Sequence, residues 1–338
     1  MSIDRTFRQP APTLEDVAAT AGVSRSTASR VINGSPQVSA AVIEAVNSAI
    51  KDLNYIPNRA ARSLANRQTM AIALVVPEDT TRFFGDPYFS AIVDGISRGL
   101  DESDYVLNLQ LAGPSQKAIR YLTGGNVDGA LVVSHHAGDH FLSAISSTLP
   151  VVVNGRPLNL DEQDNYFVDV DNISGAQLGT EHLISLGRKR IATISGPADM
   201  PAGLDRSAGW AAALSAAGLT SERLAYGDFS LAGGADAMRQ LLDRWPDLDA
   251  VFVASDLMAM GAVSVLRERG KAVPKDVAVV GFDDSPAALS GDVKLTTVRQ
   301  PAIEMGEKMA RMLLQLLRGQ PTERQCIMPT SLVVRDSA

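Results

Sequence analysis

The chain has 338 residues, with 31 Lys and Arg against 38 Asp and Glu, a formal net charge of −7, and a single cysteine, Cys326. One cysteine excludes an intrachain disulfide and a metal site built from several cysteines, and we expect it to be a buried small hydrophobe. No segment reaches the ~18 consecutive apolar residues of a membrane span, and the N-terminus lacks the apolar core of a secretory signal. We therefore expect a soluble, cytoplasmic protein.

The acidity of the whole chain argues against a nucleic-acid partner, but the charge is unevenly distributed. Residues 1–70 hold eight Lys and Arg and five Asp and Glu, a net charge of +3, so the remaining 268 residues carry −10. A basic end on an acidic body concentrates the attraction for phosphates at that end. Residues 1–12 are polar and contain two prolines, and we expect a disordered arm there.

Two short helical patterns surround the turn Ala21-Gly22-Val23. The first helix follows Thr13, a favourable N-cap, and has apolar residues at helical spacing. The second can be capped by Ser24 and turns Ala28 inward, while its opposite face has only hydrogen-bonding side chains. That order is typical of a helix-turn-helix motif, whose second helix contacts base edges in the major groove. An ordinary helical hairpin with a charged solvent face is the alternative. The outward residues are Arg25, Ser26, Ser29 and Arg30.

A third helix, expected at 40–53, would complete a small core. Pro57 restarts the chain, and 58–66 can form a further short helix. Helices of fewer than ~12 residues are marginal in water, so this last one needs a partner in order to fold.

The string TLEDVAATAGVSRSTASRVING, followed by VSAAV and LNYIPNRAARSLA, resembles the headpiece and hinge of the LacI/GalR family of bacterial transcription regulators. The resemblance continues to the C-terminus. It implies a helix-turn-helix domain at 13–57, a hinge helix and linker at 58–69, and an effector-binding and dimerisation domain at 70–338. The DNA-contacting residues that it implies are Thr13, Leu14, Ser24, Arg25, Ser26, Ser29, Arg30, Asn33, Tyr55, Asn58 and Leu64.

The roles of these residues differ. The resemblance implies that the outward face of the second helix reads bases, while Thr13, Asn33 and Tyr55 contact the DNA backbone. It also implies that the hinge helices of a homodimer pair in the minor groove, where Leu64 enters a base step and kinks the duplex. Packing of Leu64 on its own headpiece is the alternative.

From Met70 onward, apolar runs alternate with amphipathic helices. Continuous runs of β-branched residues separated by helices indicate parallel sheets that are buried on both faces. About 270 residues suit two α/β lobes with a ligand site between them, at the carboxyl ends of the strands. Strands are predicted at 71–76, 105–111, 129–134, 150–154, 190–195, 250–255 and 277–282.

The resemblance implies a periplasmic-binding-protein-like domain with Rossmann-like lobes. It gives an N-lobe of 71–167 and 299–325 and a C-lobe of 168–298 and 326–338, with three crossings that act as a hinge. Rotation of the lobes would control the hinge helices, so a bound effector would change the affinity for DNA.

Polar and aromatic residues follow several predicted strands, as a sugar site requires. Carboxylates and Arg bind hydroxyls, and an aromatic ring covers the apolar face of a pyranose. The resemblance assigns effector contacts to Arg206, Asp283 and Ser255, with Phe229 as the stacking ring. Of the pair Asp283 and Asp284, we expect Asp283 to contact the ligand and at least one to cap a helix. The full predicted set is Tyr88, Phe89, Ser134, Arg206, Phe229, Ser255, Asp256, Asp283 and Gln300.

Enzyme and metal functions fit the sequence poorly. It has no Gly-rich phosphate loop and no G-x-S-x-G motif, so no cofactor is expected. The pair Asp169 and Asp171 could suggest glycoside hydrolysis, but it precedes a helix start where acidic residues cap. His136, Asp139 and His140 have ligand-like spacing, yet Ala137-Gly138 interrupts them and a solvated loop is favoured over a metal site.

A cytoplasmic sugar sensor that has lost DNA binding remains the alternative to a regulator. The intact second helix of the headpiece argues against it. A palindromic operator requires two headpieces, so we expect a homodimer. The C-terminal residues lack the leucine heptads that would indicate a tetramer.

Overall fold

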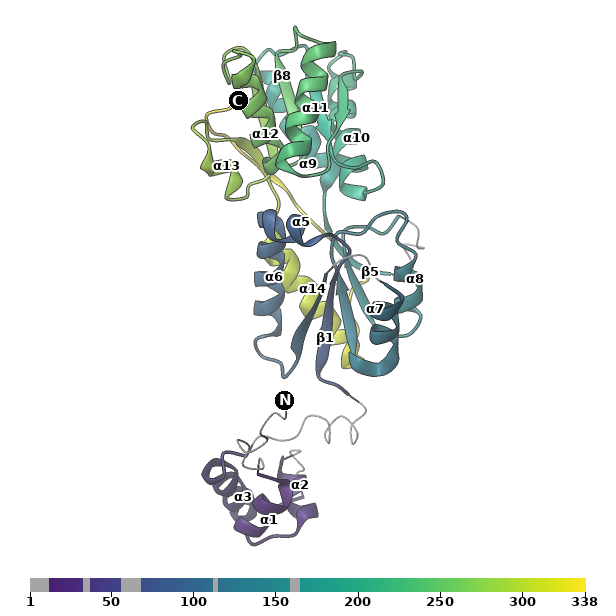
Figure 1. The fold of residues 1–338 in the computed structure, drawn as a ribbon, viewed down its shortest axis with the longest axis vertical. Helices are drawn as coiled ribbons and strands as arrows, with labels where there is room; N and C mark the ends of the chain where they lie inside the picture. The colour runs from purple at the N-terminus through teal and green to yellow at the C-terminus, as the bar shows by residue number, and fades with distance from the viewer. Residues whose placement is uncertain (1–11, 33–36, 56–67, 112–114, 159–164) are drawn as a thin grey trace, which may run out of the picture. The chain divides into compact units, whose positions relative to one another are not determined.

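The computed structural model describes residues 12–32, 37–55, 68–111, 115–158 and 165–338 (Figure 1). The chain divides into two compact units, Met1–Thr69 and Met70–Ala338, which we call the headpiece and the core domain. The predicted arm up to residue 11, the hinge helix at 58–66, and the individual residues Asn33, Asn58 and Leu64 lie outside the described residues.

The headpiece consists of α1 (Leu14–Thr20), α2 (Arg25–Ile32) and α3 (Ala40–Asp52). Both predicted N-caps are confirmed. The Thr13 hydroxyl accepts from the Asp16 amide at 3.2 Å, and the Asp16 carboxylate accepts from the Thr13 amide at 2.8 Å, which makes a capping box. The Ser24 hydroxyl accepts from the Thr27 amide at 3.1 Å. These caps fix where α1 and α2 begin.

The headpiece core is small. Val17, Val46, Ala49 and Tyr55 form its buried cluster, and Ala28 of α2 is fully buried as predicted. Tyr55 is only 9% exposed. Its ring therefore belongs to the packing of the headpiece, and the DNA-backbone contact implied for Tyr55 stays a prediction.

The first lobe of the core domain is a sheet in the order β11-β5-β4-β3-β1-β2 with all pairs parallel. Helix α14 crosses back to pack beside α6 on this sheet (Figure 1). The strands are β1 (Ala71–Val76), β2 (Val106–Leu111), β3 (Gly129–Val132), β4 (Val151–Asn154), β5 (Tyr166–Val170) and β11 (Gln325–Met328). The helices are α5 (Thr80–Gly85), α6 (Pro87–Leu100), α7 (Gln116–Tyr121), η1 (Leu122–Asn126), α8 (Phe141–Ser146) and α14 (Ala302–Leu317).

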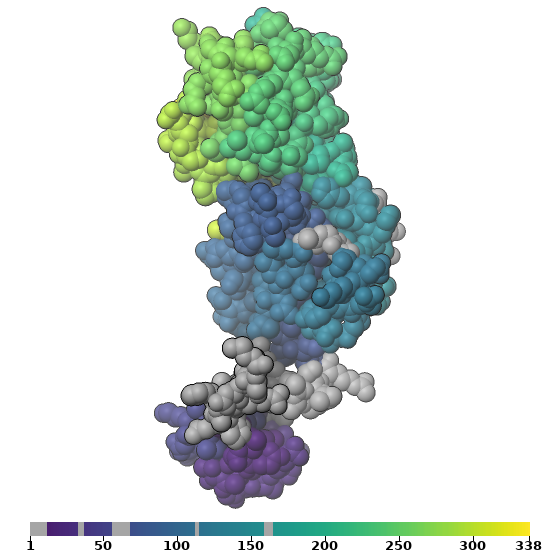
Figure 2. Space-filling model, viewed as in Figure 1, coloured from purple at the N-terminus to yellow at the C-terminus, as the bar shows by residue number. Residues whose placement is uncertain are grey.

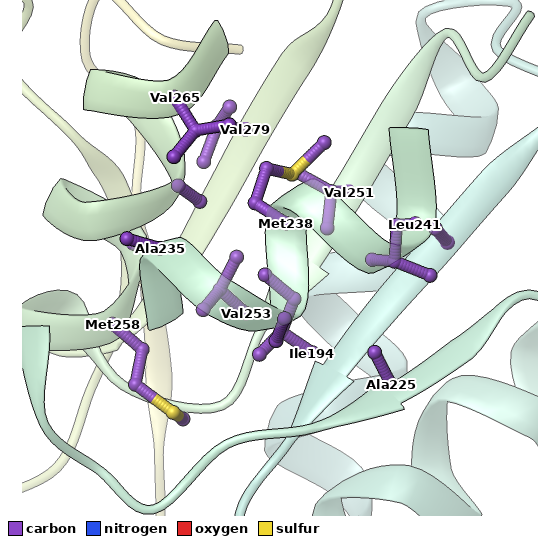
Figure 3. Packing of buried hydrophobic residues seen from close by; sticks show 14 of the residues in the cluster. Ile194, Ala225, Ala235, Met238, Leu241, Val251, Val253, Met258, Val265 and Val279 are labelled. Atoms are coloured by element: carbon purple, nitrogen blue, oxygen red, sulfur yellow. The ribbon is translucent and has the colours of Figure 1, made fainter. Parts of the chain in front are cut away.

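The second lobe is a sheet in the order β12-β10-β9-β8-β6-β7, parallel except for the β10–β12 pair. Met238 on α11 and Val265 on α12 pack with strand residues Val251 and Val279 in its core (Figure 3). The strands are β6 (Ile191–Ser195), β7 (Leu224–Tyr226), β8 (Ala250–Val253), β9 (Ala278–Asp283), β10 (Thr296–Arg299) and β12 (Ser331–Val333). The helices are α9 (Asn172–Ser185), α10 (Pro201–Ala216), α11 (Leu231–Arg244), α12 (Asp256–Glu268) and α13 (Ala287–Ser290).

The chain passes between the two sheets after β5, after β10 and after β11. The predicted crossings lie a few residues too early, because β5 continues in the first sheet to Val170 and β11 continues there to Met328, while β10 reaches Arg299 in the second sheet. Cys326 on β11 is half-buried, so the prediction of a buried thiol is wrong: β11 is an edge strand with one partner. No helix among the described ranges is long and apolar enough to cross a membrane.

Candidate effector pocket and DNA-binding surface

Helix α2 presents the polar face that the sequence predicts. Arg25, Ser26 and Arg30 are exposed and Ser29 is half-buried. The Arg25 guanidinium lies 2.8 Å from the Glu15 carboxylate of α1, and both side chains are more than half exposed. An exposed pair of this kind contributes little to stability, so it can be exchanged for a phosphate or a base at low cost. Leu14, by contrast, packs against the headpiece core.

The core domain contains a pocket of about 680 Å³, including its open mouth, between the two lobes. Its wall combines residues at the carboxyl ends of strands from both sheets, as the doubly wound topology requires. The seam between the lobes is visible where the blue and green surfaces meet in Figure 2. The structure places all predicted effector residues except Asp256 in the pocket wall. They are Tyr88, Phe89, Ser134, Arg206, Phe229, Ser255, Asp283 and Gln300.

Arg206 on α10 is the anchor of the second-lobe wall. Its Nε donates to Asn172 Oδ1 at 2.8 Å and its Nη1 donates to the Ala254 carbonyl at 2.7 Å. The guanidinium lies over the Phe282 ring, 3.6 Å from its centroid. Burial lowers the pKa of Arg206, while the neighbouring Asp283 opposes that change. The remaining guanidinium nitrogen is therefore held in a fixed direction.

Asp283 faces Arg206 at 3.7 Å and accepts from Gln300 Nε2 at 2.6 Å. Burial raises the pKa of Asp283 well above its usual range, against the effect of the Arg206 charge. Its φ of 114° lies in the left-handed region, and so do those of two further pocket residues, Ser134 at 62° and Phe229 at 63°. Such strained backbone at a binding site holds side chains in place before the ligand arrives.

Two acidic predictions need correction. Asp256 is fully buried outside the pocket, where it accepts from the Thr297 hydroxyl at 2.6 Å and the Ser285 amide at 2.8 Å. Its neighbour Ser255 caps α12 and lines the pocket. Asp284 does not cap a helix but is ion-paired with Arg299 at 2.7 Å and with Arg335. Neither Asp283 nor Asp284 is the N-cap of α13, which is Pro286.

Beside the charged residues Arg82, Asp86 and Asp169, the first-lobe wall carries neutral polar groups. Tyr88 donates its hydroxyl proton to Asn154 Oδ1 at 2.6 Å. Burial raises the pKa of Tyr88, so it stays neutral. The Asn154 Nδ2 group is buried and has no hydrogen-bond partner among the described residues. The wall thus offers an unsatisfied amide donor beside the Tyr88 oxygen.

His135 and Ser134 add acceptors to the same wall. His135 is 3% exposed, and burial lowers its pKa, so its ring is neutral. Because the Arg156 carbonyl, 3.2 Å from Nε2, can only accept, that nitrogen donates the proton and Nδ1 is left as an unpartnered acceptor within the described structure. Ser134 donates to Glu78 at 2.6 Å, so its lone pairs remain available.

The loop after β3 is solvated at Gly138 and His140, as the sequence suggests, but His136 is held by side chains of the protein. His136 lies between Glu78 at 3.3 Å and Asp199 at 2.9 Å, which belong to different lobes. Sequence reasoning missed these two contacts because neither Glu78 nor Asp199 is near His136 in sequence. The interpretation of Asp171 as a cap is confirmed, since it accepts from the Ser174 amide at the start of α9.

Several pocket residues were missed by sequence reasoning. Asn172 and the buried Asp169 position Arg206 from the first crossing between the lobes, and Arg82 on α5 reaches the Asp228 carbonyl of the other lobe. The available signal for the first two was the run of polar residues at the end of the 166–170 strand, where Asp169 lies within the strand and Asn172 begins the next helix. The wall residues that were not predicted are Arg82, Asp86, His135, Asn154, Gly155, Asp169, Asn172, Met200, Pro201, Ala202 and Met305.

Comparisons with known proteins match both units. Residues 13–58 match the family model of bacterial regulatory proteins, lacI family, and residues 180–338 match that of a periplasmic binding protein-like domain. The HTH-type transcriptional regulator CelR of Thermobifida fusca is 47% identical over 98% of this chain and 99% of its own. The ribose operon repressor of Escherichia coli (strain K12) is 36% identical over 93% of this chain and 95% of its own.

Solved structures agree. A transcriptional regulator CelR–cellobiose complex is 46% identical, covers 97% of this chain and all of that chain, and has a TM-score of 0.77. The lac repressor dimer bound to operator and the anti-inducer ONPF is 30% identical, covers 97% of this chain and 99% of that chain, and has a TM-score of 0.83. With full-length relatives well above 30% identity, the chain belongs to the lacI family of bacterial regulatory proteins and is a DNA-binding transcriptional regulator rather than an enzyme.

Proposed function

We propose that this regulator represses transcription by binding operator DNA as a homodimer, and that a β-linked glucose disaccharide such as cellobiose, bound between the lobes, changes its DNA affinity. The observation that supports the effector class is the hydrogen-bonding pattern of the pocket. It combines an anchored guanidinium, Arg206, with acceptors and an unsatisfied amide donor, Asn154 Nδ2, on the facing wall. Sugar hydroxyls both donate and accept, so a polyol can satisfy both walls.

The apolar part of the pocket suits a pyranose. Phe229 and Met200 come from the second lobe, and Phe89 and Met305 from the first. An aromatic ring can cover the apolar face of a sugar. The volume lies in the range of small-molecule sites, and a relative with 46% identity has been solved with cellobiose. These points together favour a disaccharide over the ribose named for the more distant relative.

An exposed apolar surface supports the homodimer. Leu231 and Leu289 in the second lobe are 45% and 51% exposed, beside a groove lined by Met260 and Val263. Exposed apolar side chains beside such a groove are typical of a protein interface. A second copy of the chain is its fitting occupant, because two headpieces are needed for a two-fold operator and the related lac repressor binds its operator as a dimer. Operator binding also places the working protein in the cytoplasm.

The test is a titration of the full-length protein on a fluorescent duplex from the region upstream of its own gene, with and without cellobiose. We expect two chains per duplex, a steep loss of affinity with salt, and a 5- to 150-fold change in affinity on adding cellobiose, equivalent to about 1–3 kcal/mol of coupling. Maltose, the α-linked disaccharide, is the matched control and should have little effect.

The same titration checks the DNA-reading face. Arg25→Ala should weaken specific binding by at least about tenfold, since a bidentate base contact is worth about 1–3 kcal/mol. Arg239→Ala, in an exposed ion pair of the second lobe, should change nothing. Cellobiose binding without any salt-sensitive DNA binding would instead identify a sugar sensor.

A further inference from the structure

Contacts beside the pocket join the two lobes at the loop after β3. The Ala137 amide donates to the Asp199 carbonyl at 2.8 Å, and His136 Nδ1 lies 2.9 Å from an oxygen of the Asp199 carboxylate. Asp199 belongs to the second lobe, between β6 and α10, whereas His136 belongs to the first. A second cross-lobe pair, Arg156 and Asp205, lies 2.9 Å apart.

The other side of His136 leads to the pocket. His136 Nε2 lies 3.3 Å from Glu78 Oε1, and the same oxygen accepts from the Ser134 hydroxyl at 2.6 Å. Glu78 follows β1 and is 9% exposed. One buried carboxylate oxygen therefore contacts a pocket residue and the histidine that bridges the lobes.

The charges require His136 to be an imidazolium. Both of its nitrogens face carboxylates, and only the doubly protonated ring can donate from both. The hydrogen bond to Glu78, followed by the bond and charge of Asp199, raises the pKa of His136 to about 9. Burial alone would raise the pKa of Glu78, but the bonds from His136 and Ser134 and the charge of Arg82 lower it. The other charged or titratable groups nearby are His135 and Asp139, which accepts from the His136 amide.

We propose that Glu78 and His136 are positioning residues that couple closure of the lobes to the polarity of the effector pocket. When Asp199 meets His136, the imidazolium is held against Glu78, and Glu78 keeps the Ser134 proton turned away from the ligand. Ser134 then presents an acceptor to a ligand hydroxyl. This role rests on the proposed function, because it assumes that the effector binds in this pocket.

The coupling has a pH signature. The closed lobes favour the protonated histidine, so the contribution of the bridge to closure is complete below the ordinary histidine pKa of about 6.5 and is lost as the pH rises through about 9. Deprotonation removes the donor that Asp199 or Glu78 needs. Effector affinity should therefore fall between pH 7.5 and 10 in the wild type.

The bridge is tested first without ligand, by NMR titration of the histidine ring protons in the full-length protein. We expect His136 to titrate near pH 9 in the wild type and about one unit or more lower in Asp199→Asn. Asp243→Asn is the matched control, because it neutralises an aspartate that lies 2.9 Å from Arg269 within the second lobe. The proposal would be overturned if wild-type His136 titrated near pH 6.5, or if its pKa were the same in the wild type and in Asp199→Asn.

Calorimetry with cellobiose at pH 7.5 and pH 10 then tests the coupling. Wild-type affinity should fall about fivefold across this range, while His136→Gln should be weaker at pH 7.5 and insensitive to pH. In Glu78→Gln, the fall in cellobiose affinity should occur at lower pH. Asp199→Glu should restore much of the cellobiose affinity that Asp199→Asn loses. Equal pH dependence in the wild type and His136→Gln would contradict the role of the histidine. If the wild type does not bind cellobiose at all, the proposed effector is wrong, and the NMR titration still decides the bridge.

Discussion

The two walls of the pocket are built on different principles. The second-lobe wall holds a buried charge pair, Arg206 and Asp283, whose remaining bonds to Asn172, Ala254 and Gln300 fix its geometry. The first-lobe wall also carries charged residues, Arg82, Asp86 and Asp169, but it differs in holding neutral groups that are only partly satisfied, such as Asn154. A buried charge held by several hydrogen bonds is rigid, whereas a buried donor without an acceptor costs free energy until a ligand pairs with it. For the proposed effector, we infer that the second-lobe wall is the anchoring wall and the first-lobe wall the selecting wall.

The largest expected effect comes from the anchoring wall. Arg206→Lys keeps the positive charge but loses the planar fork that meets Asn172 and Ala254. We expect at least about a 100-fold loss of cellobiose affinity in calorimetry, equivalent to about 3 kcal/mol, with DNA affinity retained in the absence of effector. Arg239→Lys changes an exposed ion pair of the same lobe and should leave cellobiose affinity unchanged. Cellobiose affinity within threefold of the wild type would show that Arg206 is not the anchor.

A smaller effect is expected at the selecting wall. Tyr88→Phe removes an acceptor and leaves Asn154 Oδ1 without its donor. One neutral hydrogen bond with a stranded partner is worth about 1–2 kcal/mol, so we expect roughly a tenfold loss of cellobiose affinity. Tyr121→Phe is the matched control, since the Tyr121 hydroxyl accepts from Asn108 on the exposed side of the same lobe. A loss as large as that of Arg206→Lys would erase the difference between the walls.

The same contrast explains how far sequence reasoning could reach. The resemblance to a known family implied the roles of Arg206, Phe229 and Asp283, and the structure places all three in the pocket wall. Phe229 follows β7, a strand that the sequence pattern did not predict. The helix-turn-helix and the alternation of strands and helices were readable, because hydrophobic period and N-caps are local properties. The division of these strands and helices into two lobes was inferred from the resemblance to a known family.

The predictions for Asp256 and His136 missed contacts with residues that are distant in sequence. Asp256 follows a strand and was expected in the pocket, but Thr297, 41 residues away, draws its carboxylate into the sheet. His136 looked solvated because its partners, Glu78 and Asp199, lie 58 and 63 residues away. Hydrophobic periodicity and helix-capping residues do not reveal which buried polar groups will contact each other.

The smallest expected effect on effector affinity comes from Asp256, which supports the anchoring wall from behind. Burial raises its pKa to about 7, against its bonds from Thr297 and the Ser285 amide. Because the folded pKa is raised, its contribution to stability is complete below its ordinary pKa of about 3.9 and is lost as the pH rises through about 7. Asp256→Asn keeps the neutral shape: its Oδ1 can accept from the Ser285 amide, and its Nδ2 can donate to the Thr297 hydroxyl oxygen.

We therefore expect Asp256→Asn to change cellobiose affinity by less than about threefold at pH 7, a difference too small to count as loss of a ligand contact. Urea unfolding between pH 4.5 and 7 should show the larger change. In that window the wild-type free energy of unfolding should fall more steeply with pH than that of the variant, by at most about 1.4 kcal/mol per pH unit, the value for one proton. Asp243→Asn should leave the slope unchanged. Parallel slopes in wild type and Asp256→Asn would mean that Asp256 is ionised throughout, and that the anchoring wall rests on a buried charge behind the pocket as well as within it.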